Sequence, residues 1–153
     1  MPRGEMARQS MEGAARTYEE LFMSESPTVP VIAVVDDDES VRESLAGLAE
    51  SAGYETALFD SAEEFLNSAR HRTDLDCLIL DVRLPAMSGV ELHNRLTAAG
   101  WFVPTIFITA HADPLPAREP GVLTVLYKPF RPEVLLESVR IAIGQSRRFA
   151  DPT

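Results

Sequence analysis

Five short apolar runs alternate with segments of helical periodicity between residues 31 and 145, and this alternation limits the fold more than any other feature of the chain. Continuous apolar runs are typical of strands buried on both faces of a parallel sheet, and apolar residues three and four apart indicate amphipathic helices. The pattern predicts an α/β fold in one domain. The expected strands are 31–35, 54–59, 76–80, 104–109 and 122–127, and the expected helices are 39–52, 61 onward, 88–99 and 132–145.

Strands that alternate with helices form a doubly wound sheet with helices on both faces, a three-layer arrangement. Right-handed crossovers restrict the topology, and the five-stranded order 2-1-3-4-5 fits this pattern. In that order the first and third strands are neighbours where the winding reverses. Such sheets bind ligands beyond the carboxyl ends of their strands at that point.

The predicted helices carry capping signals at their ends. Asp38 is expected to cap the helix that follows the first strand. Ser61 with Glu64 three residues later forms a capping-box pattern. Gly53 and Gly100 follow the last apolar positions of two helices and predict where those helices stop.

Composition excludes several classes of function. A net charge of -10 argues against a direct nucleic-acid partner, because phosphate contacts need clustered basic side chains. Arg147 and Arg148 form the only tight basic pair, which we interpret as a solvated helix end. The single cysteine, Cys77, lies in an apolar strand and suits a reducing compartment. No apolar stretch reaches the ~20 residues of a membrane span, so the sequence predicts a cytoplasmic protein without membrane contact.

Residues 1–29 differ from the rest of the chain. Their apolar positions predict a helix over 5–23, with Glu12 and Arg16 as an i,i+4 ion pair. One interpretation is a docking or dimerising helix, which would give a homodimer; the other is a poorly ordered tail. We expect an N-terminal extension (1–29), a main domain (30–147) and a C-terminal tail (148–153).

Polar groups follow four of the apolar runs at the point where each run ends. The aspartates 36–38 follow the first run and Asp81 follows the third, while Thr109 and Lys128 follow the last two. Each has a simpler interpretation when taken alone: a helix cap, a turn residue, a strand-end hydroxyl and a solvated lysine. Together they place carboxylates, a hydroxyl and an amine at one edge of the predicted sheet.

These groups suit phosphoryl transfer to a carboxylate. Packed carboxylates repel one another unless a cation compensates, and Mg²⁺ accepts one or two carboxylates together with waters and phosphate oxygens. Asp81 would be the nucleophile that forms an acyl phosphate. Lys128 would pair with a phosphoryl oxygen, and the hydroxyl of Thr109 would donate to another.

These residues resemble the receiver domain of two-component response regulators, most closely the FixJ-type subfamily. The resemblance covers about residues 31–145 and implies the flavodoxin- or CheY-like fold. It also implies phosphorylation of Asp81 by the phosphohistidine of a histidine kinase or phosphotransfer protein, with Mg²⁺ as cofactor. The matching segments are VVDDD (34–38), LDVRLPAMSG (80–89), FITAH (107–111) and KPF (128–130).

The resemblance assigns roles by position. Asp37, Asp81 and the backbone carbonyl of Arg83 would be direct metal ligands, with Asp36 acting mainly through water. The bond from Lys128 to the following proline would be the family's cis peptide, which aims the lysine into the site. Arg83 and His111 would flank the phosphoryl group and hinder the attacking water.

Two departures from the family concern the response to phosphorylation. The family places a full helix between the fourth and fifth strands, but the segment between Thr109 and Gly121 is short and contains three prolines. Proline in a helix interior costs about 3 kcal/mol, so we expect this helix to be shortened or lost. The family's switch aromatic is replaced by Val125, and Tyr127 is the nearest aromatic, which alters the coupling that begins at Thr109.

The leading functional prediction is a stand-alone receiver that signals through protein contacts or phosphorelay to an unknown output protein. We expect no enzymatic activity beyond self-phosphorylation from small donors and autodephosphorylation. One alternative is a fragment of a longer transcription regulator. Another is a Mg²⁺-dependent phosphatase, although Arg83 stands where such enzymes generally carry a second aspartate. A third is a degenerate receiver with a purely structural role.

Overall fold

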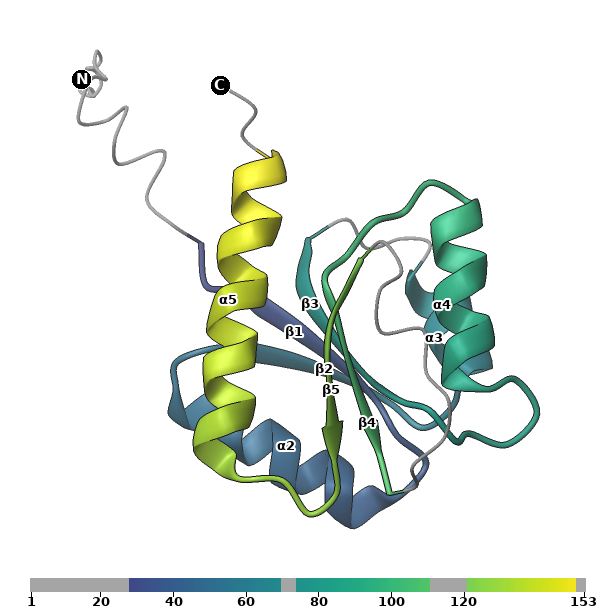
Figure 1. The fold of residues 1–153 in the computed structure, drawn as a ribbon, viewed down its shortest axis with the longest axis horizontal. Helices are drawn as coiled ribbons and strands as arrows, with labels where there is room; N and C mark the ends of the chain where they lie inside the picture. Colours follow the sequence, from purple (N-terminus) through teal and green to yellow (C-terminus); the bar gives the residue numbers. More distant parts are fainter. Residues whose placement is uncertain (1–27, 70–73, 111–120, 151–153) are drawn as a thin grey trace, which may run out of the picture.

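A computed structural model describes residues 28–69, 74–110 and 121–150. Within them a five-stranded parallel sheet has the order β2-β1-β3-β4-β5, which confirms the predicted topology (Figure 1). Each strand lies within one residue of its predicted limits. The strands are β1 (Val31–Val35), β2 (Glu55–Phe59), β3 (Leu75–Asp81), β4 (Thr105–Thr109) and β5 (Val122–Tyr127).

Helices cover both faces of this sheet, so the predicted three-layer fold is confirmed. In Figure 1, α2 and α5 lie on one side of the strands and α3 and α4 on the other. The four described helices are α2 (Glu39–Ser51), α3 (Ala62–Ala69), α4 (Gly89–Ala98) and α5 (Pro132–Ala150).

Successive side chains of each strand alternate between the two faces of the sheet, which produces two separate hydrophobic cores. Ile32 and Val34 of β1 pack with residues of α2 and α5, whereas Ala33 and Val35 pack with residues of α3 and α4. Successive side chains of a strand point to opposite faces of the sheet. Asp36 therefore follows β1 on the α2 and α5 side.

Local capping contacts fix where the helices begin. The side chain of Asp38 accepts from the N–H groups of Ser40 and Val41, as predicted for the cap of α2. The hydroxyl of Ser61 accepts from Glu64 N at 3.0 Å. The Glu64 carboxylate accepts from Asp60 N rather than from the cap residue itself, so the capping box closes one residue earlier than its pattern implies.

The C-terminal helix differs from the prediction. Helix α5 continues to Ala150, past the expected end at residue 145, and Arg147 is not a solvated helix end. Its guanidinium bonds to the buried carboxylate of Asp76 at 3.1 Å and to the carbonyl oxygen of Thr28 at 3.0 Å. Asp76 also accepts from Val31 N at 3.1 Å. These contacts join α5 to the starts of β1 and β3, 71 residues away along the chain in the case of Asp76.

Replacing Arg147 by methionine is expected to lower the free energy of unfolding by about 2 kcal/mol, because it leaves a buried carboxylate without its cation. Urea unfolding followed by the fluorescence of Trp101, the only tryptophan, measures the change. Arg140→Met is the matched control, since Arg140 bonds to Glu137 on the exposed face of α5 and exposed pairs contribute about 0.5 kcal/mol. Equal effects of the two substitutions would contradict a stabilising contact at Asp76.

Some predictions fall outside the described residues. They are the helix over 5–23, the shortening of the helix between β4 and β5, and the position of His111. The limits of the three predicted domains stay predictions. None of the described helices combines the length and apolar character needed to cross a membrane.

Candidate functional site

The predicted site residues of β1, β3, β4 and the end of β5 meet at the carboxyl edge of the sheet. Asp36 and Thr109 are fully buried, and Asp81 is 5% exposed. Parallel pairing sets Val35 beside Leu80 and Asp81 beside Ile108, so the ends of the three central strands lie together. The fold thus gathers groups that are far apart in the sequence.

Asp36 is held at several of its polar atoms. Its N–H donates to the carbonyl oxygen of Phe59 at 3.1 Å. Its Oδ1 accepts from Asp38 N at 2.9 Å, and its Oδ2 accepts from Lys128 Nζ at 3.1 Å. A buried carboxylate needs such partners, because an unpaired one costs several kcal/mol. Asp36 therefore contributes fixed negative charge at the end of β1.

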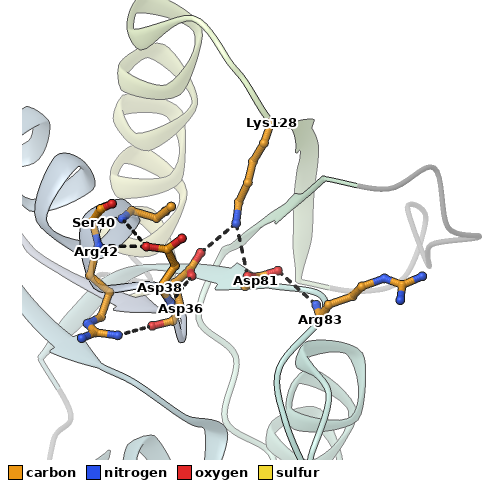
Figure 2. A network of polar contacts seen from close by, with 8 residues as sticks. Asp36, Asp38, Ser40, Arg42, Asp81, Arg83 and Lys128 are labelled. Carbon is orange, nitrogen blue, oxygen red and sulfur yellow. Dashed lines mark hydrogen bonds and ion pairs between the residues drawn. The ribbon is translucent and has the colours of Figure 1, made fainter.

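Lys128, the only lysine in the sequence, bridges two acids. Its Nζ lies 3.1 Å from Asp36 Oδ2 and 3.3 Å from Asp81 Oδ2 (Figure 2). Partial burial opposes the charged form, but hydrogen bonds and attraction from both carboxylates outweigh it and raise the pKa of Lys128. The following peptide bond to Pro129 is cis, as the family resemblance implied.

The carboxyl group of Asp81 has an unusual protonation equilibrium. Burial, followed by repulsion from Asp36, raises its pKa to about 6. The N–H of Arg83, which donates to Asp81 Oδ1 at 3.0 Å, and the Lys128 ammonium oppose that rise. The site therefore concentrates more negative charge than one lysine offsets, and an additional cation would lower the energy of the ionised form.

In EDTA, the free energy of unfolding is expected to decrease as pH rises, and part of this decrease should depend on Asp81. Its pKa is higher in the folded protein (about 6) than the ordinary value of 3.8, so the folded state binds this proton more tightly. The resulting stability is fully present below 3.8 and is lost as pH rises through about 6. Urea unfolding of the parent and Asp81→Asn across this range measures the difference. Parallel pH profiles of the two proteins would contradict the shift.

Three carboxylates could hold a metal ion. Single oxygens of Asp36, Asp37 and Asp81 lie within 4.8 Å of one another, with Asp37 exposed at the mouth of the site. An all-oxygen donor set of this charge fits a hard divalent cation such as Mg²⁺. Asp38 is not part of this set. Its Oδ1 accepts from the Val41 and Ser40 N–H groups at the start of α2, and these bonds lower its pKa.

The remaining predicted residues take various positions. The side chain of Arg83 extends away from the Asp81 carboxylate, and its backbone N–H makes the contact (Figure 2). Val125 is partly buried on β5, and Tyr127 is half exposed at the end of that strand. Thr109 accepts from Lys128 N at 2.7 Å through its carbonyl oxygen, which ties the end of β4 to the lysine.

Sequence reasoning gave no role to two residues that support the site. A Cβ on Gly89 would lie 2.0 Å from the carbonyl oxygen of Asp81, so only glycine fits there. Arg42 donates to the carbonyl oxygen of Asp36 at 2.7 Å. The glycine was visible in the motif after Asp81, but the close approach that requires it is tertiary.

Comparison with known proteins identifies the family. A family model described as the response regulator receiver domain matches residues 32–140, which is more than half of the chain. The chain belongs to the response regulator receiver family. Receiver domains of this family are signalling domains of two-component systems, which agrees with the resemblance found in the sequence.

This receiver domain is similar to several named proteins. It is 40% identical over 121 residues to response regulator protein TodT of Pseudomonas putida, covering 77% of this chain and 53% of TodT. It is 41% identical over 116 residues to transcriptional regulatory protein FixJ of Azorhizobium caulinodans, covering 74% and 54% of the two chains. The solved structure of response regulator StyR matches with a TM-score of 0.73 at 43% identity, covering 80% of this chain and 64% of that chain.

The chain spans about half the length of the curated relatives it matches. Similarity to these relatives therefore supports the receiver domain itself. Several of these relatives are named as transcriptional regulatory proteins, and the name describes those proteins.

Proposed function

We propose that this domain accepts a phosphoryl group on Asp81 from a phosphohistidine of a histidine kinase or phosphotransfer protein. The observation that supports the proposal most is the Lys128 ammonium, which is bonded to Asp36 and Asp81 beside a third acid. Phosphoryl transfer requires mainly positioning and compensation of charge. A nucleophilic carboxylate, a fixed ammonium and a set of oxygen ligands supply both.

The transfer is an exchange of one bond for another at phosphorus. An oxygen of the Asp81 carboxylate bonds to phosphorus as the bond between phosphorus and the imidazole nitrogen of the donor breaks, and the electrons of that bond remain on the nitrogen. Lys128 then pairs with a phosphoryl oxygen in place of Asp81 Oδ2. The hydroxyl of Thr109 donates to a second phosphoryl oxygen, which holds the product at the ends of β3 and β4.

We assign the cation site to Asp37, Asp81 and the backbone carbonyl of Arg83, with Asp36 acting through water. The hydrogen bonds that Asp36 already accepts from Asp38 and Lys128 favour this indirect role. When bound, Mg²⁺ would neutralise charge on the phosphoryl oxygens. Arg83 and His111 stay proposed modulators of hydrolysis, and faster loss of phosphate from Arg83→Ala would support that role.

Two other activities have less support. A Mg²⁺-dependent phosphatase of the type that also uses a strand-end aspartate generally needs an acid two residues later, and Arg83 stands there. A purely structural receiver would not need the buried acids and lysine to be kept together, since burying charge is costly. We therefore propose a phosphoacceptor whose own chemistry is limited to self-phosphorylation and autodephosphorylation.

Incubation with Mg²⁺ and acetyl phosphate, followed by measurement of intact mass, tests the proposal. The parent is expected to gain one phosphoryl unit, and Asp81→Asn is expected to gain none. Asp38→Asn is the matched control, because it removes a carboxylate from the segment that follows the neighbouring strand β1, while asparagine still caps α2. A parent mass that never rises, or an Asp81→Asn variant that is modified like the parent, would refute the assignment.

For the output we propose phosphorylation-dependent protein contacts in the cytoplasm, in a stand-alone receiver, with a homodimer as one form of such contact. The names of the relatives favour a second candidate, the receiver portion of a transcription regulator. Immunoblotting of the source cells separates the two, since a stand-alone receiver would migrate at the size of 153 residues. Light scattering with and without beryllofluoride tests the homodimer.

A further inference from the structure

Arg42 occupies a position where a basic side chain is disfavoured. It is the fourth residue of α2, close to the positive end of the helix dipole, where acidic residues are favoured. It also lies three, four and seven residues before Leu45, Ala46 and Ala49, the buried residues of α2. A guanidinium here opposes the helix dipole and lies on the face of α2 that carries buried apolar residues. A specific acceptor is needed to offset both unfavourable effects.

The acceptor lies in the aspartate segment 36–38, which follows β1. Arg42 Nη1 donates to the carbonyl oxygen of Asp36 at 2.7 Å (Figure 2). This carbonyl is part of the peptide group that joins Asp36 to Asp37. The other polar groups of Asp36 are bonded to Phe59, Asp38 and Lys128. Arg42 therefore fixes the remaining polar group of the buried acid and the plane of the peptide that leads to Asp37.

We infer that Arg42 is a positioning residue that sets the divalent-cation affinity of the Asp36, Asp37 and Asp81 cluster. The inference rests on the proposed function, because the same cluster would hold the cation for phosphorylation. Asp37 is exposed, so the direction of its carboxylate depends on the backbone that carries it. Holding the peptide between Asp36 and Asp37 in one orientation keeps the Asp37 oxygen within reach of the other two acids.

Arg42 also carries charge, and this effect has the opposite sign. A guanidinium near the site repels a divalent cation, so its removal would strengthen cation binding if charge alone mattered. Loss of orientation would weaken binding, and partners that orient metal ligands are typically responsible for about tenfold or more in metal affinity. Because Arg42 is only partly buried, water screens its charge, and we expect loss of orientation to dominate.

Isothermal titration calorimetry with Mg²⁺ alone tests this inference on the full chain. Arg42→Met removes the donor and the charge but retains most of the apolar stem, and its dissociation constant for Mg²⁺ is expected to rise about tenfold. Arg42→Lys restores a charged donor and is expected to recover much of the affinity. Arg95→Met is the matched control, since Arg95 pairs with Glu91 on the exposed surface of α4, and it is expected to bind Mg²⁺ like the parent.

Affinity in Arg42→Met that equals or exceeds that of the parent would overturn the inference, because the guanidinium would then act only through charge or not at all. If Arg42→Met does not fold, as judged by Trp101 fluorescence, an Arg42→Gln variant that folds and binds Mg²⁺ as tightly as the parent would overturn it instead. Phosphorylation from acetyl phosphate at saturating Mg²⁺ should recover in Arg42→Met. A parent that binds Mg²⁺ but never gains mass would refute the proposed function while leaving the calorimetric comparison valid.

Discussion

Replacing Gly89 by alanine is expected to lower the free energy of unfolding by about 3 kcal/mol or more. The new Cβ would lie 2.0 Å from the carbonyl oxygen and 2.9 Å from the carbonyl carbon of Asp81. Both atoms belong to the backbone, so no change of rotamer can relieve the contact. The N–H of Gly89 bonds to the carbonyl oxygen of Val82 at 2.9 Å, and separation of the two segments would break this bond between α4 and the end of β3.

Urea unfolding measures this change, and Gly47 supplies the matched control. Gly47 lies inside α2 with no atom within 4 Å of a built Cβ, so Gly47→Ala should raise the free energy of unfolding by about 1 kcal/mol through helix propensity. We also expect slower phosphorylation of Gly89→Ala, because the displaced segment carries the Asp81 carbonyl. The decisive result is a lower free energy of unfolding for Gly89→Ala together with a higher one for Gly47→Ala. A Gly89→Ala protein as stable as the parent would show that the loop adapts freely.

Replacing Lys128 by methionine is expected to lower the free energy of unfolding by about 3 kcal/mol in EDTA at neutral pH. The substitution keeps an apolar stem of similar length but leaves the fully buried Asp36 carboxylate without its cation. It also leaves Asp36 and Asp81 to repel each other, which should raise the pKa of Asp81 further above the parent value of about 6. We therefore expect the loss of stability to be smaller at acidic pH, where Asp81 is protonated.

Mg²⁺ should partly rescue Lys128→Met, because a bound cation supplies the missing positive charge and stabilises the folded state by mass action. The increase in unfolding midpoint on adding Mg²⁺ is therefore expected to be larger for the variant than for the parent. Arg131→Met, which removes a charge from an exposed pair with Glu133, should change the stability by less than about 0.5 kcal/mol. Equal stability of the parent and Lys128→Met in EDTA would mean that the lysine does not compensate the acids.

The fold could be predicted from the sequence because its signals are local. Buried parallel strands appear as apolar runs, and the limits of β1 and β5 match the runs at 31–35 and 122–127. Helix α5 departs from this pattern at its C-terminal end. Gly144 and the polar residues after it favour a stop near residue 145, but the contact of Arg147 with Asp76 holds a further turn of helix in place. That contact joins residues too far apart for any periodicity to reveal.

The candidate site likewise contains residues that could be predicted from the sequence and residues that could not. Asp36, Asp81, Thr109 and Lys128 could be expected at one edge because strand ends of a parallel sheet meet there, and the structure brings them together. Arg42 could not be identified, because its partner is a backbone carbonyl and carries no residue signature. The orientation of the Arg83 side chain was equally inaccessible, since an exposed arginine has no packing pattern that fixes its rotamer.

The hydrogen bond between Arg147 and Thr28 has a consequence for protein engineering. It places Thr28, three residues before β1, beside α5, at the end of the sheet opposite the carboxyl ends of the strands (Figure 1). In a domain shortened to the described residues, a reporter domain or tag fused directly to residue 28 or residue 150 would start on that remote side, away from Asp81. A shortened version of the domain should retain Arg147, since trimming at residue 145 would remove the residue that ties the two ends together.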